Sequence, residues 1–242
     1  MCRHLAYVGS PIALGALLTE PEHSLVEQAR DARHQTSGCE NPDGWGVGWF
    51  DDGGRPQRHR TATPIWADPE LANLARRVQS GDVMAAVRLA SPGSPVEESG
   101  NAPFVADGRW LFSLNGIVDG YHEGVGDELR TLISEHRRAG IDGESDSEVL
   151  FALALDELDA GRPLGAALAG VVTTVEARTT GRLNMLLSER GAAAATAVGN
   201  SLFCRGASLV ASEPLDGSLE WEPVADRTVL TSDGAHLVVA SL

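Results

Sequence analysis

The order in which helix-like and strand-like segments follow one another constrains the fold of this chain most strongly. Apolar runs of strand length lie towards both ends, and the helical patterns lie in the middle. In the segment 145–160, Ser145 and Glu148 have the spacing of a capping box, and residues 149–155 are all apolar. A helix that is apolar on nearly every face is buried between layers. The pattern predicts an α+β fold of stacked antiparallel sheets with helices outside.

Further segments follow the periods of strands or helices. The expected strands are 3–9, 44–50, 83–90, 109–115, 183–188, 194–198, 202–205, 208–211, 228–231 and 237–240. The expected helices are a turn or two that begins at Pro11, 23–33, 70–79, 127–138, 145–160 and 164–177. The expected connections include a hairpin turn at 51–54, an exposed basic turn at 55–60 and a loop at 91–100. No linker or repeat interrupts this order, so we expect one domain, 1–242.

The strand expected at 44–50 alternates between large apolar residues and glycine. Trp45, Val47 and Trp49 point to one face, and the glycines leave the opposite face bare. The pattern lacks the Gly-x-Gly-x-x-Gly spacing that opens a nucleotide-binding helix, so it does not indicate a nucleotide site. We expect the bare face to let another strand, or the turn at Cys2, approach closely.

Composition excludes several functional classes. The 242 residues carry a net charge of −15, which repels nucleic acid and anionic membrane surfaces. No apolar run reaches the ~20 residues that span a bilayer. The three cysteines, Cys2, Cys39 and Cys204, are far apart, and the histidines show no metal-ligand spacing. We therefore expect a cytoplasmic protein in a reducing compartment, with no disulfide, metal or cofactor.

Cys2 directly follows Met1, and this position gives it a chemistry that the other cysteines lack. Methionine aminopeptidases remove Met1 before a residue as small as cysteine, which would leave a thiol and a free α-amine on one residue. A reference thiol titrates near ~8.5 and an α-amine near ~7.7–8.0, so moving the proton costs on the order of 1 kcal/mol. Cys2 would then supply both nucleophile and base. The alternative is a buried small thiol at the start of a strand.

Six short motifs resemble, in the same order, those of the class II glutamine amidotransferases, which are enzymes with an N-terminal nucleophile. They are Met1-Cys2, 43–49 (DGWGVGW), 88–91 (RLAS), 101–104 (NAPF), 113–116 (SLNG) and 145–148 (SDSE). Each motif alone is weak, but six in order are specific, and together they span residues 2–148. The resemblance implies a four-layer αββα sandwich of the N-terminal-nucleophile hydrolase type.

The resemblance assigns the chemical step to Cys2, Asn115 and Gly116. The Cys2 thiolate would attack a γ-glutamyl amide and form a thioester, which water then hydrolyses. The side-chain amide of Asn115 and the main-chain N–H of Gly116 would stabilise the oxyanion, and glycine permits close approach to the substrate. The alternative for Asn115-Gly116 is a turn, because this pair follows an apolar run. The family commonly has His where this chain has Leu114.

The resemblance assigns substrate binding to Arg88, Ser91 and Asp146. The planar guanidinium of Arg88 suits the α-carboxylate of a γ-glutamyl group, and Asp146 would meet its α-ammonium group. Ser91 keeps a hydroxyl where the family usually has Thr. Two local alternatives stand beside these roles. Arg88 also fits a solvated strand end, and Asp146 also fits the acidic preference of a helix N-terminus.

The start MCRHLAYVG most resembles a small stand-alone subgroup that acts in ergothioneine biosynthesis. Its members remove glutamate from γ-glutamyl-hercynylcysteine S-oxide. We therefore expect hydrolysis of a small γ-glutamyl substrate without a required protein partner. One alternative keeps the site but makes the chain a glutaminase subunit that passes ammonia to a synthetase. A second alternative is a degenerate, non-catalytic member of the family that only binds its ligand.

Overall fold

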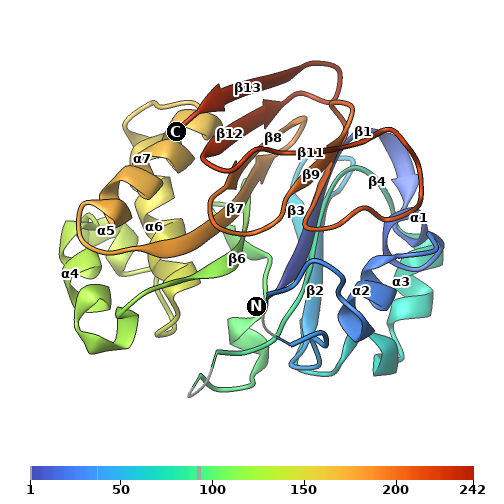
Figure 1. Ribbon diagram of the computed structural model, residues 1–242, viewed down its shortest axis with the longest axis horizontal. Helices are drawn as coiled ribbons and strands as arrows, with labels where there is room; N and C mark the ends of the chain where they lie inside the picture. Colours follow the sequence, from blue (N-terminus) through green and yellow to red (C-terminus); the bar gives the residue numbers. More distant parts are fainter. Residues whose placement is uncertain (1, 37, 92–93) are drawn as a thin grey trace.

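The computed structural model describes residues 2–36, 38–91 and 94–242. Their strands form two antiparallel sheets that pack face to face, and helices cover both outer sides (Figure 1). The residues between the two sheets include Ala6, Met84, Leu111 and Leu186, all of them buried. The four layers run helix, sheet, sheet, helix, so the α+β sandwich that the sequence predicts is confirmed.

The first sheet contains the start of the chain. In spatial order its strands are β11 (Trp221–Pro223), β9 (Phe203–Arg205), β10 (Leu209–Ala211), β1 (Arg3–Ala13), β4 (Gln79–Val87), β2 (Trp45–Phe50) and β3 (Pro56–Thr61). β1 lies in the middle, between β4 and β10, so the residue that precedes it is held by strands on both sides.

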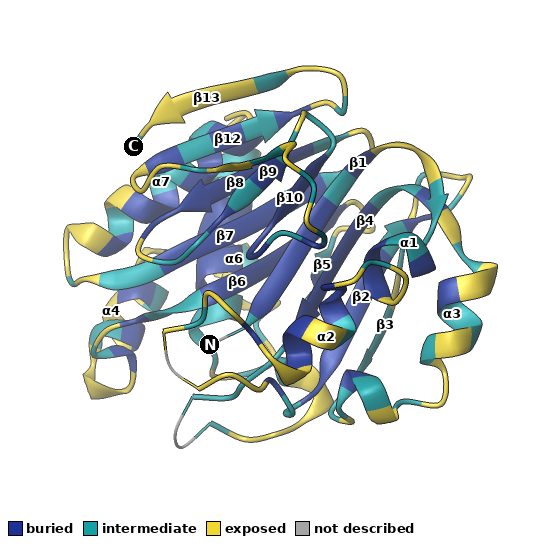
Figure 2. Ribbon diagram, turned by 45° about the vertical axis from the view of Figure 1, so that its right-hand side comes forward, coloured by how far each residue is buried: buried dark blue, intermediate teal, exposed yellow. Residues whose placement is uncertain are grey.

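The second sheet is built from the middle and the end of the chain. In spatial order its strands are β13 (Leu237–Ser241), β12 (Thr228–Ser232), β8 (Ala192–Ala197), β7 (Gly181–Glu189), β6 (Trp110–Val118) and β5 (Phe104–Ala106). The central strands are buried, whereas β13 forms an exposed edge (Figure 2).

Each sheet has its own layer of helices (Figure 1). α1 (Gly15–Leu18), α2 (Leu25–Arg30) and α3 (Leu71–Arg77) pack on the first sheet through an apolar cluster that includes Trp45. The second sheet is covered by α4 (Val125–Leu132), α5 (Glu135–Arg138), α6 (Asp146–Asp159) and α7 (Leu164–Glu176). No helix of the described residues is long and apolar enough to cross a membrane.

Helix α6 is the buried helix that the sequence predicts. Its capping box is formed, with the Ser145 side chain accepting from the Glu148 main chain and the Glu148 side chain accepting from the Ser145 main chain. All residues from Val149 to Leu155 are buried. The ring of Phe151 stacks on that of Phe112 of β6, with ring centroids 5.0 Å apart. Helix α6 is therefore packed against β6.

The bare glycine face of β2 lets the second sheet approach the first. A Cβ atom at Gly48 would lie 2.9 Å from the Leu111 side chain of β6, and one at Gly46 would lie 2.4 Å from the carbonyl oxygen of Ala102. Trp45 and Val47 point the other way, into the helix-covered core. The expectation that glycine serves a close approach at this strand is confirmed, and the approaching segments are β6 and the chain before β5.

Three local expectations are wrong, and two short strands were missed. Pro11 lies within β1 rather than opening a helix, because β1 continues to pair with β4 as far as Ala13. The segment 55–60, expected as an exposed turn, is mostly β3, which pairs with β2 along its whole length. The helix expected at 127–138 is interrupted before Ser134, whose side chain caps a second helix, α5. The short strands β5 and β11 were not expected.

Candidate active site

One cavity gathers most of the residues that the sequence predicts for a site. It has a volume of about 480 Å³, within the range of small-molecule sites. Its walls come from the start of β1, the segment after β4, the end of β6, the start of α6 and the start of β7. The predicted residues that line it are Cys2, Arg88, Ser91, Gly116 and Asp146. Residues more than 140 positions apart in sequence therefore line the same cavity.

Asn115 lies beside this cavity and contacts Cys2 directly. The main-chain nitrogen of Cys2 donates a hydrogen bond of 3.2 Å to Oδ1 of Asn115. Nδ2 of Asn115 donates to the Ser212 hydroxyl at 3.3 Å. An amide nitrogen carries two hydrogens, so this bond leaves one for a further acceptor. Met1, whose removal the sequence predicts, lies outside the described residues.

The interpretation of Asn115-Gly116 as a turn is wrong, because both residues lie inside β6. Asn115 is opposite Asn184, and Gly116 is opposite Leu183, in the pairing with β7. A Cβ atom at Gly116 would lie 1.8 Å from the carbonyl oxygen of Arg182. Glycine is therefore required here by the close approach of the neighbouring strand. This reason is distinct from the approach of substrate that the sequence suggested.

A buried ion-pair network behind Cys2 was not predicted. Arg3 is fully buried; its Nε donates to the carbonyl oxygen of Cys2 at 2.7 Å, and its Nη1 lies 2.9 Å from Glu213. Glu213 also contacts the His23 ring at 2.9 Å. It accepts two main-chain N–H bonds, from Arg33 and His34. The network therefore holds the carbonyl group of Cys2, and Asn115 holds its main-chain nitrogen.

Hydrogen bonds and the opposite charges within this network stabilise the charged forms of Glu213 and Arg3. Burial alone would raise the pKa of Glu213, but the bonds from His23 and two main-chain N–H groups, with the charge of Arg3, lower that pKa to about 2. Burial lowers the pKa of Arg3, and the Glu213 carboxylate opposes that change. One sequence signal could have pointed to the network, namely an arginine inside an otherwise apolar strand, since such a buried charge needs a partner. Its partner, 210 positions away, gives no such signal.

Arg88 is held in place by the motif at 43–44. The main-chain nitrogen of Asp43 donates to the carbonyl oxygen of Arg88 at 3.0 Å, and that of Arg88 donates to Gly44 at 2.9 Å. The Asp43 carboxylate accepts from the main-chain nitrogen of Ala90 at 2.8 Å. Gly44 has a positive φ of 114°, which favours glycine. The Asp-Gly pair thus fixes the segment that follows β4.

Arg88 lines the cavity, and its guanidinium contacts the segment 95–100. Its Nη1 donates to the carbonyl oxygen of Pro95 at 3.1 Å. A Cβ atom at Gly100 would lie 2.9 to 3.0 Å from the guanidinium atoms, so Gly100 packs directly on the charged group. Ser91 lines the same cavity at the other end of this loop.

Asp146 opens α6 and points its carboxylate towards β6. Its Oδ2 accepts a hydrogen bond of 3.1 Å from the main-chain nitrogen of Val118. Burial raises the pKa of Asp146, although the bonds from Val118 and Ser147 oppose the rise. The helix N-terminus also favours a negative charge there. A half-buried carboxylate that lines a cavity is suited to a cationic ligand group, which would restore the interactions lost with water.

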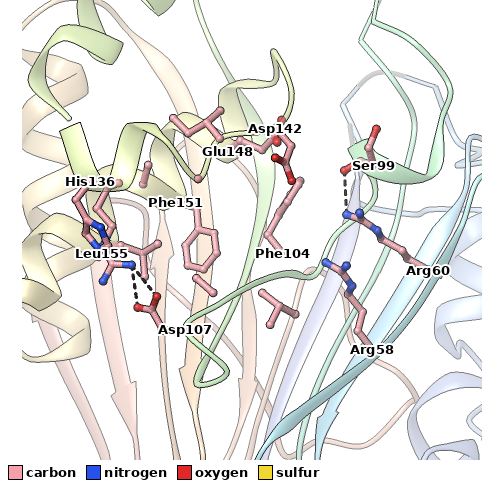
Figure 3. Close-up of a pocket in the computed structure, with 16 residues that line it drawn as sticks. Arg58, Arg60, Ser99, Phe104, Asp107, His136, Asp142, Glu148, Phe151 and Leu155 are labelled. Carbon is pink, nitrogen blue, oxygen red and sulfur yellow. Dashed lines mark hydrogen bonds and ion pairs between the residues drawn. The ribbon is translucent and has the colours of Figure 1, made fainter. Parts of the chain in front are cut away.

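A second cavity, of about 360 Å³, lies on another side of α6 and contains none of the predicted site residues (Figure 3). Arg58 and Arg60 of β3 line one wall, and Phe104 and Phe151 form an apolar part. Arg60 donates to the carbonyl oxygen of Ser99 at 3.0 Å. In the described part of the chain, no three histidine, cysteine or acidic side chains are grouped so as to hold a metal ion.

Comparisons with known proteins agree on one family. The family model described as class II glutamine amidotransferases matches residues 23–205. The gamma-glutamyl-hercynylcysteine sulfoxide hydrolase of Mycolicibacterium smegmatis is 36% identical over 245 residues, which cover 100% of both chains.

Solved structures show the same fold. A class II glutamine aminotransferase domain protein from Silicibacter pomeroyi superposes with a TM-score of 0.70 at 25% identity, over 99% of each chain. The glutamine phosphoribosylpyrophosphate amidotransferase of Bacillus subtilis superposes with a TM-score of 0.64 at 15% identity, over 100% of this chain and 49% of that one. The chain therefore belongs to the class II glutamine amidotransferases and has their N-terminal-nucleophile hydrolase fold.

Proposed function

We propose that this protein hydrolyses the γ-glutamyl amide of γ-glutamyl-hercynylcysteine S-oxide, releasing glutamate and hercynylcysteine S-oxide. The observation that carries the proposal is the convergence of Cys2, Arg88 and Asp146 on one cavity. The substrate is that of the full-length Mycolicibacterium smegmatis relative, as its name gives it.

In the proposed reaction, removal of Met1 leaves the α-amine of Cys2 free to accept the proton of its own thiol. The thiolate attacks the γ-carbonyl carbon and forms a tetrahedral oxyanion. The α-ammonium group returns the proton to the leaving amine as the C–N bond breaks, which leaves a γ-glutamyl thioester on Cys2. Water, deprotonated by the same α-amine, then cleaves the thioester and gives glutamate. Water is the only co-substrate that this reaction requires.

Asn115 has two roles in this proposal. Its Oδ1 holds the nitrogen of Cys2, which would orient the base beside the thiol. The second hydrogen on its Nδ2, together with the main-chain N–H of Gly116, would donate to the oxyanion. Because Asn115 is fully buried and bonded to Ser212, it is oriented before substrate arrives. Such preorganised donors stabilise the charge that develops in the transition state.

Arg88 and Asp146 would bind the amino-acid end of the γ-glutamyl group. Arg88 presents a planar donor for the α-carboxylate, and Asp146 presents a carboxylate for the α-ammonium group. Ser91 would add a hydroxyl donor beside Arg88. An α-linked glutamyl group lacks one of the two charges at that end, so this pair would select the γ linkage.

Glutamate release from a panel of compounds tests the proposal. The purified protein is given γ-glutamyl-hercynylcysteine S-oxide, γ-glutamylcysteine, free glutamine and an α-glutamyl dipeptide. The proposal predicts the highest kcat/KM for the first compound and no release from the α-linked one. Preference for free glutamine would instead support a subunit that supplies ammonia to a synthetase. Binding of the compounds with no release of glutamate from any of them would support a non-catalytic role.

A further inference from the structure

Arg182 lies in the same cavity as Cys2, close to the expected reaction centre. It stands at the start of β7, opposite Ile117 and next to the residue that pairs with Gly116. Its side chain is confined by Gly199, where a Cβ atom would lie 2.9 Å from Cγ of Arg182. The aliphatic stem of Arg182 is therefore packed against the protein before any ligand binds.

The guanidinium of Arg182 has no acceptor in the described part of the chain. Its Nε is buried and meets no hydrogen-bond partner, and no ion pair to Arg182 is formed among these residues. Every other described arginine whose side chain is not exposed donates at least one hydrogen bond to the protein. These arginines are Arg3, Arg60, Arg88, Arg130, Arg137 and Arg205. Arg182 is thus distinguished by the lack of a protein partner.

A partly buried cation without a partner has lost interactions with water that nothing in the protein replaces. A carboxylate of the ligand would restore them, because it accepts two parallel N–H bonds from a guanidinium. In the proposed function, Arg88 binds the one free carboxylate of the γ-glutamyl group. A second carboxylate can then come only from the leaving amine.

We infer that Arg182 binds a carboxylate carried by the leaving amine, so that the site selects γ-glutamyl amino acids over glutamine and simple γ-glutamyl amides. This inference rests on the proposed function and names the chemistry of the other half of the substrate. The two arginines come from different sheets, with Arg88 after β4 and Arg182 on β7 beside Gly116. The substrate would be held by one carboxylate on each side of the bond that breaks.

The α-carboxylate of an amino acid lies two bonds from the nitrogen that is released, so Arg182 has to lie near the reaction centre to reach it. Its pairing beside Gly116, whose N–H is an expected oxyanion donor, meets that condition. Glutamine releases ammonia, which carries no carboxylate. With glutamine bound, Arg182 would stay without a partner, and the missing bonds lower the rate for that substrate.

Two compounds that differ only in the carboxylate test the inference. These are γ-L-glutamyl-L-alanine and γ-L-glutamylethylamide, which has the same skeleton with hydrogen in place of the carboxylate. For the unmodified protein we expect a kcat/KM about 10- to 100-fold higher for the dipeptide, the size of a charge-assisted hydrogen-bond pair. In Arg182→Gln this ratio should fall towards one, chiefly through a higher KM for the dipeptide.

Arg190→Gln is the matched control, because Arg190 is exposed in the turn at the other end of β7. It should keep the ratio of the unmodified protein. The comparison of the two substrates on the unmodified protein needs no variant. It therefore tests the preference for a carboxylate on the leaving amine even if Arg182→Gln fails to fold. A ratio near one in the unmodified protein, or an equal loss for both substrates in Arg182→Gln, would overturn the inference and leave the proposed hydrolysis standing. If the protein releases glutamate from neither of these two compounds nor from γ-glutamyl-hercynylcysteine S-oxide, both the inference and the proposed function are overturned.

Discussion

The main-chain nitrogen of Cys2 and Oδ1 of Asn115 are joined by a hydrogen bond of 3.2 Å that crosses from one sheet to the other. Cys2 precedes β1 of the first sheet, and Asn115 lies within β6 of the second. The bond couples the proposed nucleophile to the proposed oxyanion donor. Their relative position is therefore set by the packing of the two sheets and by the network around Arg3, and not by a flexible loop.

Replacement of Asn115 by alanine should reduce kcat strongly and KM little. The variant loses both the acceptor for the Cys2 nitrogen and one oxyanion donor, and loss of one such donor typically costs ~100- to 1000-fold in kcat. Steady-state glutamate release measures the effect, with Asn73→Ala on α3 as a control outside the cavity. A folded Asn115→Ala protein with kcat within about threefold of the unmodified protein would contradict the assignment.

Replacement of Gly116 by alanine should destabilise the fold. The new Cβ would lie 1.8 Å from the carbonyl oxygen of Arg182, so β6 and β7 would have to separate. Overpacking of this kind costs about 1–3 kcal/mol or more. Thermal unfolding measures the loss. Gly217→Ala is the control, because a Cβ there meets nothing within 4 Å. Equal melting temperatures for both variants would show that the strand pair tolerates the side chain.

The layers of the fold could be predicted from sequence where periodicity was strong. The apolar run of α6 and the alternation of β2 both indicated their burial. β3 could not be found in the same way, because Gln57, Arg58, His59 and Arg60 show no apolar alternation. This strand lies at the edge of its sheet and forms because the hairpin after β2 returns the chain to pair with it. Such edge strands form by pairing with the neighbouring strand, and a hydrophobic pattern in the sequence does not reveal them.

Members of the candidate site could be predicted where the residue type and its position alone suggested a role. Cys2, Arg88 and Asp146 could be picked out by position or by motif, and the structure places all three in one cavity. Glu213 and Arg182 could not, because their significance depends on neighbours that are distant in sequence. Glu213 matters because Arg3 is buried against it, and Arg182 because no described residue accepts a hydrogen bond from its guanidinium.

The pH dependence of kcat/KM should show the titration of Asp146. Burial raises the pKa of this carboxyl above its ordinary value, and only the ionised form attracts the α-ammonium group of a substrate. On the acidic side, kcat/KM, which reports the free enzyme, should therefore show a step above the ordinary aspartate range near ~3.9, in addition to the step of the Cys2 α-amine near ~7.7–8.0. Asp146→Asn should lower kcat/KM and remove the Asp146 step while the α-amine step stays. An unchanged pair of steps in Asp146→Asn would assign the titration to another group.

The buried network around Glu213 should make stability depend on pH in acid. The pKa of Glu213 is lowered to about 2 from an ordinary 4.5, so its ionised form stabilises the folded state above pH 4.5. That contribution is lost as the pH falls from 4.5 to about 2 and amounts to on the order of 3 kcal/mol.

Urea unfolding at several pH values checks this dependence. Glu213→Gln should be less stable than the unmodified protein near neutral pH, because Arg3 loses its charged partner. The difference should shrink as the pH falls from 4.5 towards about 2, because the unfolded chain takes up a proton at Glu213 before the folded protein does. The exposed Glu220→Gln should stay within ~0.5 kcal/mol of the unmodified protein near neutral pH. A difference between Glu213→Gln and the unmodified protein that is constant from neutral pH to pH 3 would contradict the role of the Glu213 charge.

The central claim is that the thiol of Cys2 forms the covalent bond to the γ-glutamyl group. Its most direct test is mass spectrometry after treatment with 6-diazo-5-oxo-L-norleucine, a glutamine analogue with a diazoketone in place of the carboxamide. The attacking thiol forms a thioether with the diazo carbon, and N2 is released. The account predicts one adduct, on an N-terminal peptide that begins at Cys2, with loss of glutamate release in step with labelling. Cys2→Ala should fold, take up no label and release no glutamate, whereas Cys39→Ala should behave as the unmodified protein. A label on Cys39 or Cys204, or glutamate release by Cys2→Ala at the unmodified rate, would contradict the account.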